Sequence, residues 1–436
     1  MARPAPLLRA SGGTLGSAAR WWLAGLALLV AVRLAVPLAV LAAHGRKLPA
    51  LPRWDYVSQT GDATGFYAAG REFLSAWGRL PHALAAVVLA AAAGGLLLLV
   101  RAWRRHPAQR PWLLVGGALG AGLVVVVGVT KMQPAGAAVF GWSLLWALPM
   151  LPLRAAHALD KDSAFAVGLV LSLAANAVGI AATAVVGRRV SGSRAVGLLA
   201  GACGAAWPFL AEPIAGSTAW DNGQWLVDVG LHLYTEPLST ALAAVALALL
   251  LTDRLSPLAL SVAGVLLGYA TVVRLSNGLL AAAAVVLVWH RLGPRRVLPL
   301  LGGALALMPV VAAYWHLGYV QVFDNPQSWP TRPFSPQNVV PGWRDSLLFH
   351  PHTLVVIVPL AALGMWALRR HGWALALLGL WVLSQAVFYS FYRNLPQHPR
   401  FLYTALPAFW VLEAAGAAWL ARGAVALARG RARGAA

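Results

Sequence analysis

The chain has 436 residues, of which 60% are hydrophobic and 11% are charged, and its mean hydropathy is +0.70. A soluble globular chain has about 25% charged residues, so this composition excludes an ordinary soluble domain and is typical of a membrane protein. The formal net charge of +21 does not indicate nucleic-acid binding, because the basic residues are scattered among short connectors instead of forming one stripe. With a single cysteine, Cys203, the chain has no intramolecular disulfide and no cysteine-based metal site.

Apolar runs long enough to cross a hydrocarbon core of about 30 Å recur along the whole chain. We predict an all-α polytopic membrane protein with about twelve transmembrane helices. It forms a single domain over residues 1–436, with juxtamembrane helices on the outer face and no separate soluble domain. The predicted spans are Trp21–Ala43, His82–Val100, Pro111–Thr130, Ala164–Gly187, Ala195–Leu210, Pro237–Leu251, Leu258–Val273, Leu275–Trp289, Val297–His316, Thr353–Leu368, Trp373–Phe391 and Leu402–Leu420.

Basic residues orient these spans, because Lys and Arg gather on the cytoplasmic side of membrane proteins. With the N-terminus cytoplasmic, the short arginine-bearing connectors fall inside, and all acidic residues except Asp253 and Glu413 fall outside or near the outer face. The outer loops are then residues 44–81, 131–163, 211–236 and 317–352. We expect a multi-pass protein of the inner (plasma) membrane whose work is done on the extracytoplasmic face.

Two apolar stretches do not fit a simple alternation of spans. If residues Gly141–Leu153 crossed the membrane, the later arginine-bearing connectors would lie on the outer side. We therefore predict that this stretch is an interfacial or re-entrant helix, broken by Pro149 and Pro152. Residues Leu258–Trp289 would place Arg274 near the middle of one long helix, at a cost of about 2.5–3.5 kcal/mol. We therefore predict an outward turn at Arg274, between two short spans.

The first outer loop combines acidic residues with a helical pattern. After Gly61, apolar residues share one helical face, which predicts an amphipathic helix on the outer membrane surface; they are Phe66, Ala69 or Gly70, Phe73 and Trp77. Asp62 directly precedes this pattern, where it would act as an N-cap or carry chemistry. Capping does not explain Asp55, so both interpretations stay open.

Other outer carboxylates have structural explanations. Glu236 precedes Pro237 at the head of a span, where an acid favours the helix dipole and proline suits the first helical position. Asp221 lies in a tryptophan-rich connector with Trp220 and Trp225, whose rings serve as interfacial anchors or as a surface for stacking a sugar. Anchoring is the favoured interpretation of the tryptophans.

Three basic residues lie at the predicted outer edge of the membrane: Lys131, Arg274 and Arg400. An arginine binds a phosphate in a bidentate manner, so these positions are candidates for holding a lipid phosphate. Snorkelling to lipid headgroups is the alternative for each of them.

Motifs for other chemistries are absent from the sequence. His350 and His352 do not have the helical spacing of a metal site, and no Walker loop, dinucleotide fingerprint or nucleophile elbow occurs. An enzyme driven by a cytoplasmic nucleotide is therefore disfavoured.

Six stretches, taken in order, resemble the class C membrane glycosyltransferases, in the bacterial group related to protein mannosyltransferases and aminoarabinose transferases. They are GDATGFYAAGREFL, PAGAAVFGWSLLWAL, VGRRVSGSRAVGLLAGACGAAWP, YTEPLSTALAAVALALLL, GYATVVRLSNGLLAA and PRFLYTALPAFWVL. The resemblance implies transfer of a sugar from a polyprenyl-phosphate donor to an acceptor glycan, lipid or protein among the membrane lipids, with no nucleic acid involved.

The resemblance also implies roles for residues. Asp62 matches the essential acid of the first outer loop, as general base or as a ligand of a divalent cation such as Mg²⁺ or Mn²⁺. Arg274 and Arg400 match positions near the carrier phosphate, and Lys131 is a further candidate there. Glu236, Asp55 and Asp221 are accessory acidic candidates. This chain departs from the family pattern in two ways. Some members have an adjacent acidic pair, whereas six residues separate Asp55 from Asp62 here, and residues 82–130 look inserted. These departures leave the use of a metal open.

Two other classes compete with this assignment. A transporter or lipid flippase also has many spans with both ends inside, but such folds often contain internal repeats, and none is visible here. A polymerase or ligase of surface polysaccharide shares lipid-linked substrates, but one dominant outer loop is expected there. A purely structural membrane protein is the remaining alternative.

Overall fold

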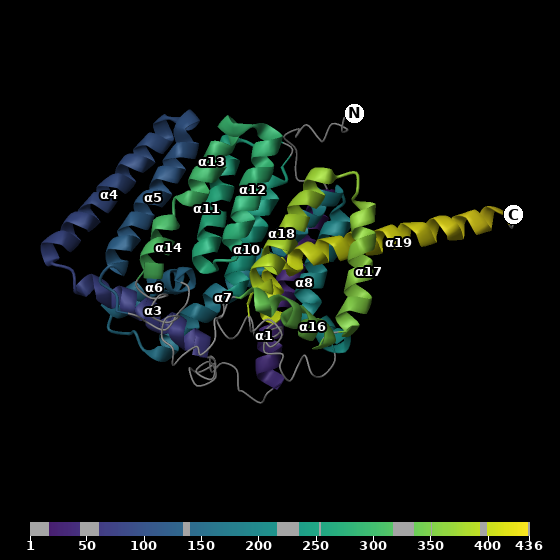
Figure 1. Cartoon of the computed structure of the whole chain (residues 1–436), viewed down its shortest axis with the longest axis horizontal. Coiled ribbons are helices and arrows are strands. Elements are labelled where there is room, and N and C mark those ends of the chain that lie inside the picture. Colours follow the sequence, from purple (N-terminus) through teal and green to yellow (C-terminus); the bar gives the residue numbers. More distant parts are fainter. Residues whose placement is uncertain are drawn as a thin grey trace.

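The computed structural model describes residues 17–43, 61–133, 140–215, 235–252, 254–316, 335–349, 351–392 and 399–434. In these ranges the regular elements are helices, without a β-strand, which confirms the all-α prediction (Figure 1). The α-helices are α1 Ser17–Ala43, α3 Gly61–Gly78, α4 His82–Arg105, α5 Arg110–Val129, α6 Gly141–Ala155, α7 Lys161–Ser191, α8 Arg194–Ala215, α10 Glu236–Leu250, α11 Pro257–Val273, α12 Asn277–Leu292, α13 Pro294–Leu305, α14 Met308–Tyr314, α16 Val339–Phe349, α17 Pro351–Ala367, α18 Gly372–Ser390 and α19 Leu406–Gly434.

Six helical segments of the described chain are long and apolar enough to cross a membrane. They are His82–Arg105, Pro107–Val129, Lys161–Ser191, Pro294–Tyr314, Gly372–Ser390 and Leu402–Arg429. Each predicted span falls on a helix or, for Val297–His316, on the consecutive helices α13 and α14. Several of these, among them α10, α11 and α12, are apolar but shorter than a full crossing. A helical membrane protein is thus supported, whereas the count of about twelve crossings is not established.

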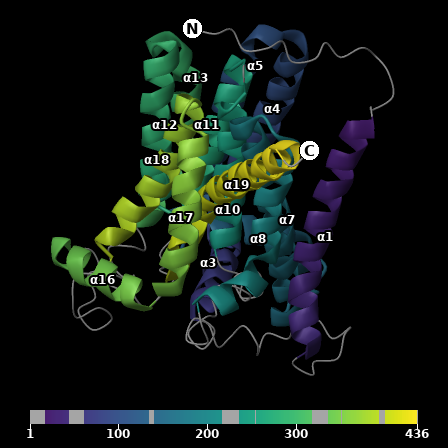
Figure 2. The same ribbon diagram turned by 90° about the vertical axis from the view of Figure 1, so that its right-hand side faces the viewer.

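The long helices run side by side (Figures 1 and 2). Helices α3 and α6 lie together at one end of them (Figure 1). The α4–α5 and α12–α13 turns lie at the opposite end (Figure 1). These two arginine-bearing turns and helix α3 therefore lie at opposite ends of the described bundle. The far part of α19 extends sideways from the bundle (Figure 1).

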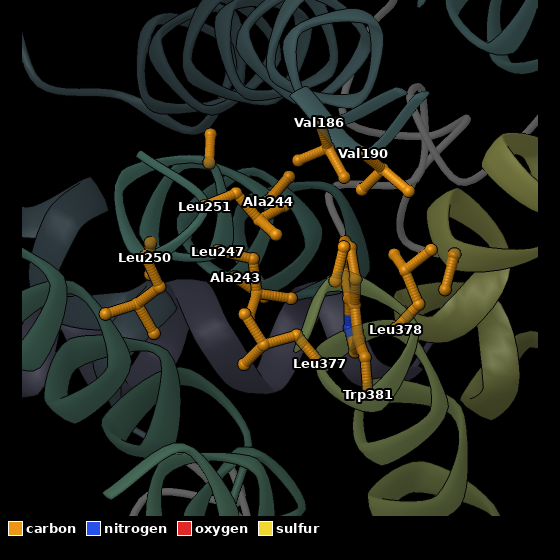
Figure 3. Packing of buried hydrophobic residues seen from close by; sticks show 14 of the residues in the cluster. Val186, Val190, Ala243, Ala244, Leu247, Leu250, Leu251, Leu377, Leu378 and Trp381 are labelled. Atoms are coloured by element: carbon orange, nitrogen blue, oxygen red, sulfur yellow. The ribbon is translucent and has the colours of Figure 1, made fainter. Parts of the chain in front are cut away.

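A tightly packed apolar core joins α7, α10 and α18 (Figure 3). Val186 and Val190 of α7, Leu247 of α10, and Leu377 and Trp381 of α18 gather in this core, and Trp381 is fully buried (Figure 3). Alanines such as Ala243 and Ala244 on α10 let the neighbouring helices approach closely. This packing fixes the relative positions of the ends of α10 and α18, where the polar residues discussed below are found.

The predicted break between two short spans at Arg274 is confirmed. α11 ends at Val273 and α12 begins at Asn277. Arg274 has an extended backbone as the C-cap of α11, and its amide donates to the carbonyl of Ala270. The turn therefore removes Arg274 from the middle of a continuous apolar helix.

The predicted break in α6 is wrong, because the helix continues through Pro149 and Pro152. A proline inside a helix costs roughly 3 kcal/mol, and tertiary packing offsets that cost here. Trp142, Trp146 and Met150 are fully buried along α6. The indole nitrogen of Trp146 also donates to the carbonyl of Ala164, 2.6 Å away.

The apolar face predicted for α3 is confirmed, but it is covered by protein and does not rest on the membrane surface. Phe66, Ala69 and Phe73 are buried. A Cβ at Gly70 would lie 3.0 Å from the Ser143 carbonyl of α6, and one at Gly128 of α5 would lie 2.6 Å from the Phe73 ring. α3 is therefore a packed part of the bundle end.

Polar side chains cap the start of helix α7. Asp160 caps the helix by accepting from the Ser163 amide at 2.7 Å, and the Ser163 hydroxyl accepts from the Asp160 amide. These hydrogen bonds from the Ser163 backbone and side chain hold the pKa of Asp160 below its ordinary value. Polar groups at this helix start are thus satisfied locally.

We expect Gly364→Ala to destabilise the fold by about 1–3 kcal/mol. A Cβ at Gly364 of α17 would overlap the backbone carbonyl of Leu412 in α19, and Gly416 faces the Leu360 carbonyl in the same way. Thermal unfolding in detergent measures the effect. Gly379→Ala in α18 is the matched control, since a Cβ there meets no neighbouring atom within 4 Å. Equal melting temperatures for the two variants would contradict the close contact.

Candidate functional site

A buried ion pair lies where α10 begins and α11 ends. Arg274 Nη1 is 2.6 Å from Glu236 Oε1, and their side chains are only 7% and 2% exposed. The same nitrogen donates to the hydroxyl of Thr235 at 3.0 Å, and that hydroxyl in turn donates to Glu236 Oε2 at 3.4 Å. Two of the predicted site residues, Arg274 and Glu236, are therefore brought together by the antiparallel packing of α10 and α11.

Tyr389, near the end of α18, holds the guanidinium from a third direction. Its hydroxyl accepts hydrogen bonds from Arg274 Nε, at 3.1 Å, and from Nη2. It also donates to the hydroxyl of Ser276 at 3.4 Å. The guanidinium lies 5.5 Å from the tyrosine ring centroid, within the range of a cation–π contact. Arg274 is thereby fixed in one orientation.

Sequence reasoning missed Tyr389 and Thr235. Thr235 directly precedes Glu236, but Tyr389 is 115 residues from Arg274. The available signal was a cluster of hydroxyl-bearing residues, Tyr389 and Ser390, at the end of an otherwise apolar span. Such a cluster indicates that the end of the helix is polar, but it does not predict which residue the hydroxyl groups contact.

Electrostatics explains why these groups cluster. An isolated charge in a low-dielectric interior is costly, and even a buried pair recovers its desolvation cost only with good geometry and additional hydrogen bonds. Arg274 and Glu236 have both, through Thr235 and Tyr389. The site is thus a preorganised cation whose charge is balanced by a fixed carboxylate.

Helix α6 connects this site to the acidic loop. A Cβ at Gly141 would lie 2.6 Å from the Val273 amide nitrogen, so only glycine allows this close approach. The Tyr269 hydroxyl donates to the Gly141 carbonyl at 2.8 Å. Since α3 packs on α6, the helix that carries Asp62 is joined by direct packing to the turn that carries Arg274.

Asp62 lies within the first turn of α3, which begins at Gly61. The sequence placed it just before the helix, so the predicted N-cap position is shifted by at least one residue. An acidic residue in a first helical turn favours the helix dipole. The backbone position alone therefore does not separate the capping interpretation from the chemical one.

Glu72 has a structural role in the same helix. Its carboxylate pairs with Arg79 and accepts from the backbone amide of Gln133 at 2.7 Å. Arg79 also donates to the Lys131 carbonyl at 3.2 Å. Glu72 thus joins α3 to the chain that follows α5.

Of the remaining predicted site residues, two lie on described backbone and two fall outside the described chain. Lys131 is exposed after the end of α5. Arg400 lies in the 3₁₀-helix η5, Pro399–Ala405. Asp55 and Asp221 lie outside the described residues.

A divalent cation would need donor side chains that lie close together. No group of three or more His, Cys, Asp and Glu side chains occurs among the residues the structure places. Glu236, the accessory acid whose side chain is placed, is held by Arg274. We therefore derive no step through Mg²⁺ or Mn²⁺.

An apolar cavity of about 960 Å³ lies between α4, α5, α6, α11 and α14. Glycines of the α4–α5 hairpin, including Gly95, Gly117 and Gly120, line it. Val272 and Val310 line both this cavity and a small adjoining one that reaches Leu275, the neighbour of Arg274. The two cavities thus share part of their lining, and Arg274 and Glu236 do not line either of them.

We expect Tyr389→Phe to destabilise the fold by about 1.5–3 kcal/mol, because hydrogen bonds to the charged Arg274 are lost. The phenyl ring keeps the cation–π contact, so the protein should stay folded. Denaturant unfolding in detergent measures the difference. Tyr392→Phe, at the part-exposed end of the same segment, is the control and should cost less; an equal cost would contradict the role of the Tyr389 hydroxyl.

Comparisons of the chain with protein-family models, with characterised proteins and with solved structures find no match.

Proposed function

We propose that this chain is a membrane glycosyltransferase that moves a sugar from a polyprenyl-phosphate donor to an acceptor hydroxyl on the extracytoplasmic face. The observation that carries the proposal is the buried Arg274–Glu236 pair at the bundle end. Helix α6 packs against the end of α11, next to this pair, and also against α3, the helix that bears Asp62. A cation for a phosphate and an acid for a hydroxyl thus belong to one packed unit. The order of the sequence stretches that resemble class C glycosyltransferases supports the same assignment.

In the proposed reaction the Asp62 carboxylate takes the proton of the acceptor hydroxyl. The acceptor oxygen then bonds to the anomeric carbon while the bond from that carbon to the phosphate oxygen breaks. The products are the glycosylated acceptor and a free polyprenyl phosphate. A positioned base of this kind contributes about 10²–10⁴-fold to the rate.

Arg274 would offset the negative charge that develops on the departing phosphate. A preorganised cation in a site that excludes water is worth more than one in bulk solvent. Glu236 and Tyr389 keep the guanidinium in place before the donor arrives, so little reorganisation is needed. Arg400, in η5, is proposed as a second phosphate contact.

The apolar cavity gives the carrier chain a place to lie. Its lining of glycine, alanine, valine and leucine suits an isoprenoid chain. In this proposal the chain crosses the plasma membrane about twelve times, and the short helices α10, α11 and α12 surround the site.

The test is mass analysis of lipid-linked sugars and envelope glycans in a strain that lacks this chain. We expect a polyprenyl-phosphate sugar to accumulate and one sugar to disappear from an envelope acceptor, with both changes reversed by the restored gene. Accumulation confined to the cytoplasmic leaflet would instead favour a flippase. An unchanged lipid and glycan profile would contradict the assignment.

A further inference from the structure

A chain of buried amides and hydroxyls runs beside the ion pair and connects four elements. Ser239 belongs to α10, Asn277 to α12, Gln385 to α18 and Thr404 to η5, and all four side chains are buried. Gln385 lies in a segment apolar enough to cross a membrane. Polar side chains buried at such depth are costly, so their partners need an explanation.

Asn277 closes the turn that carries Arg274. Its amide nitrogen donates to the Ser239 hydroxyl at 2.7 Å and to the Ala270 carbonyl at 3.0 Å. Ala270 is in the last turn of α11, and Asn277 is the first residue of α12. The side chain therefore bridges the two ends of the turn and holds it against α10.

Gln385 extends this bridge to η5. Its amide nitrogen donates to Asn277 Oδ1 at 3.2 Å, and its amide oxygen accepts from the Thr404 hydroxyl at 3.2 Å. The orientations agree along the whole chain, because Asn277 uses its nitrogen for Ser239 and Ala270 and its oxygen for Gln385. Thr404 lies four residues after Arg400, in the same 3₁₀-helix.

We infer that Gln385 is a positioning residue that ties the Arg274 turn to the 3₁₀-helix bearing Arg400, and so builds one phosphate site from two separate segments. This inference rests on the proposed function. An apolar side chain at position 385 would itself have no desolvation cost. It would not, however, bond Asn277 and Thr404 and so would not set the distance between the Arg274 turn and η5. Fully satisfied buried networks specify one geometry in this way.

The experiment measures binding of undecaprenyl phosphate to the purified full chain in detergent. We expect Gln385→Leu to weaken binding about tenfold, the scale of one lost hydrogen-bonding link. The KM for the donor should rise while the KM for the acceptor stays unchanged. Ser384→Ala is the matched control, because Ser384 is buried on the same helix but donates only within it, to the Trp381 carbonyl, and its binding should equal that of the wild type.

A double-mutant cycle with Arg274 distinguishes a positioning role of Gln385 from a general packing role. If Gln385 acts through Arg274, the variant with both Arg274→Lys and Gln385→Leu should bind scarcely more weakly than Arg274→Lys alone. Fully additive losses would overturn the inference. Where Gln385→Leu does not yield folded protein, Thr404→Val, which removes only the hydroxyl link, replaces it in the same cycle.

The two levels of the proposal fail differently. Wild-type protein that binds undecaprenyl phosphate, together with a Gln385→Leu variant that binds it equally well, would overturn the positioning role and leave the proposed function standing. Wild-type protein that does not bind the carrier would overturn the proposed function, and this inference with it.

Discussion

Glu236→Gln is expected to destabilise the protein by about 3–5 kcal/mol, the cost of leaving a buried charge without its partner. Glu236 and Arg274 are both nearly fully buried, and their closest atoms are 2.6 Å apart. Thr235 and Tyr389 contact the guanidinium through hydroxyl groups, whereas Glu236 supplies the carboxylate. Chemical unfolding in detergent, compared with the wild type, measures the loss.

A matched control comes from a second carboxylate–arginine pair among the described residues. Glu72 and Arg79 are 19% and 39% exposed, so Glu72→Gln should cost at most about 1 kcal/mol. Combining Glu236→Gln with Arg274→Met should recover part of the stability, because the unpaired charge is removed as well. A single Glu236→Gln variant as stable as the wild type would show that Arg274 does not depend on this carboxylate.

Asp62→Asn is expected to lower the rate of sugar transfer by at least about 10²-fold, since an amide cannot accept the acceptor proton. The fold should be retained, because the interaction of a first-turn carboxylate with the helix dipole contributes only about 0.3–1 kcal/mol. The measurement is turnover of a polyprenyl-phosphate sugar by the purified variant, with its melting temperature recorded in parallel.

The same substitution at Asp160 controls for loss of a helix-start carboxylate. Asp160 caps α7 through Ser163 and has no part in the proposed chemistry, so Asp160→Asn should leave turnover unchanged. Normal turnover by Asp62→Asn would leave Asp62 only a structural role in the first turn of α3 and would remove the general base from the proposed mechanism.

The sequence by itself determined where the membrane-type helices form. Such helices depend on local apolar runs, and a charged residue that is costly to place inside a run ends it. The predicted spans fall on helices, although Val297–His316 is divided between α13 and α14. The turn at Arg274 was predictable because a charge in the middle of an apolar helix is costly. The buried face of α3 followed from helical spacing of Phe66 and Phe73.

Only the tertiary structure decided what those local features contact. It showed that α6 stays helical through Pro149 and Pro152, that α3 packs on protein, and that Arg274 is held by Glu236 and by Tyr389, which is 115 residues away. Periodicity records which face of a helix is apolar, and it does not record whether lipid or protein covers that face. The partner of a buried charge likewise depends on which helix ends meet in three dimensions, and that is set by the packing of α7, α10 and α18 as a whole.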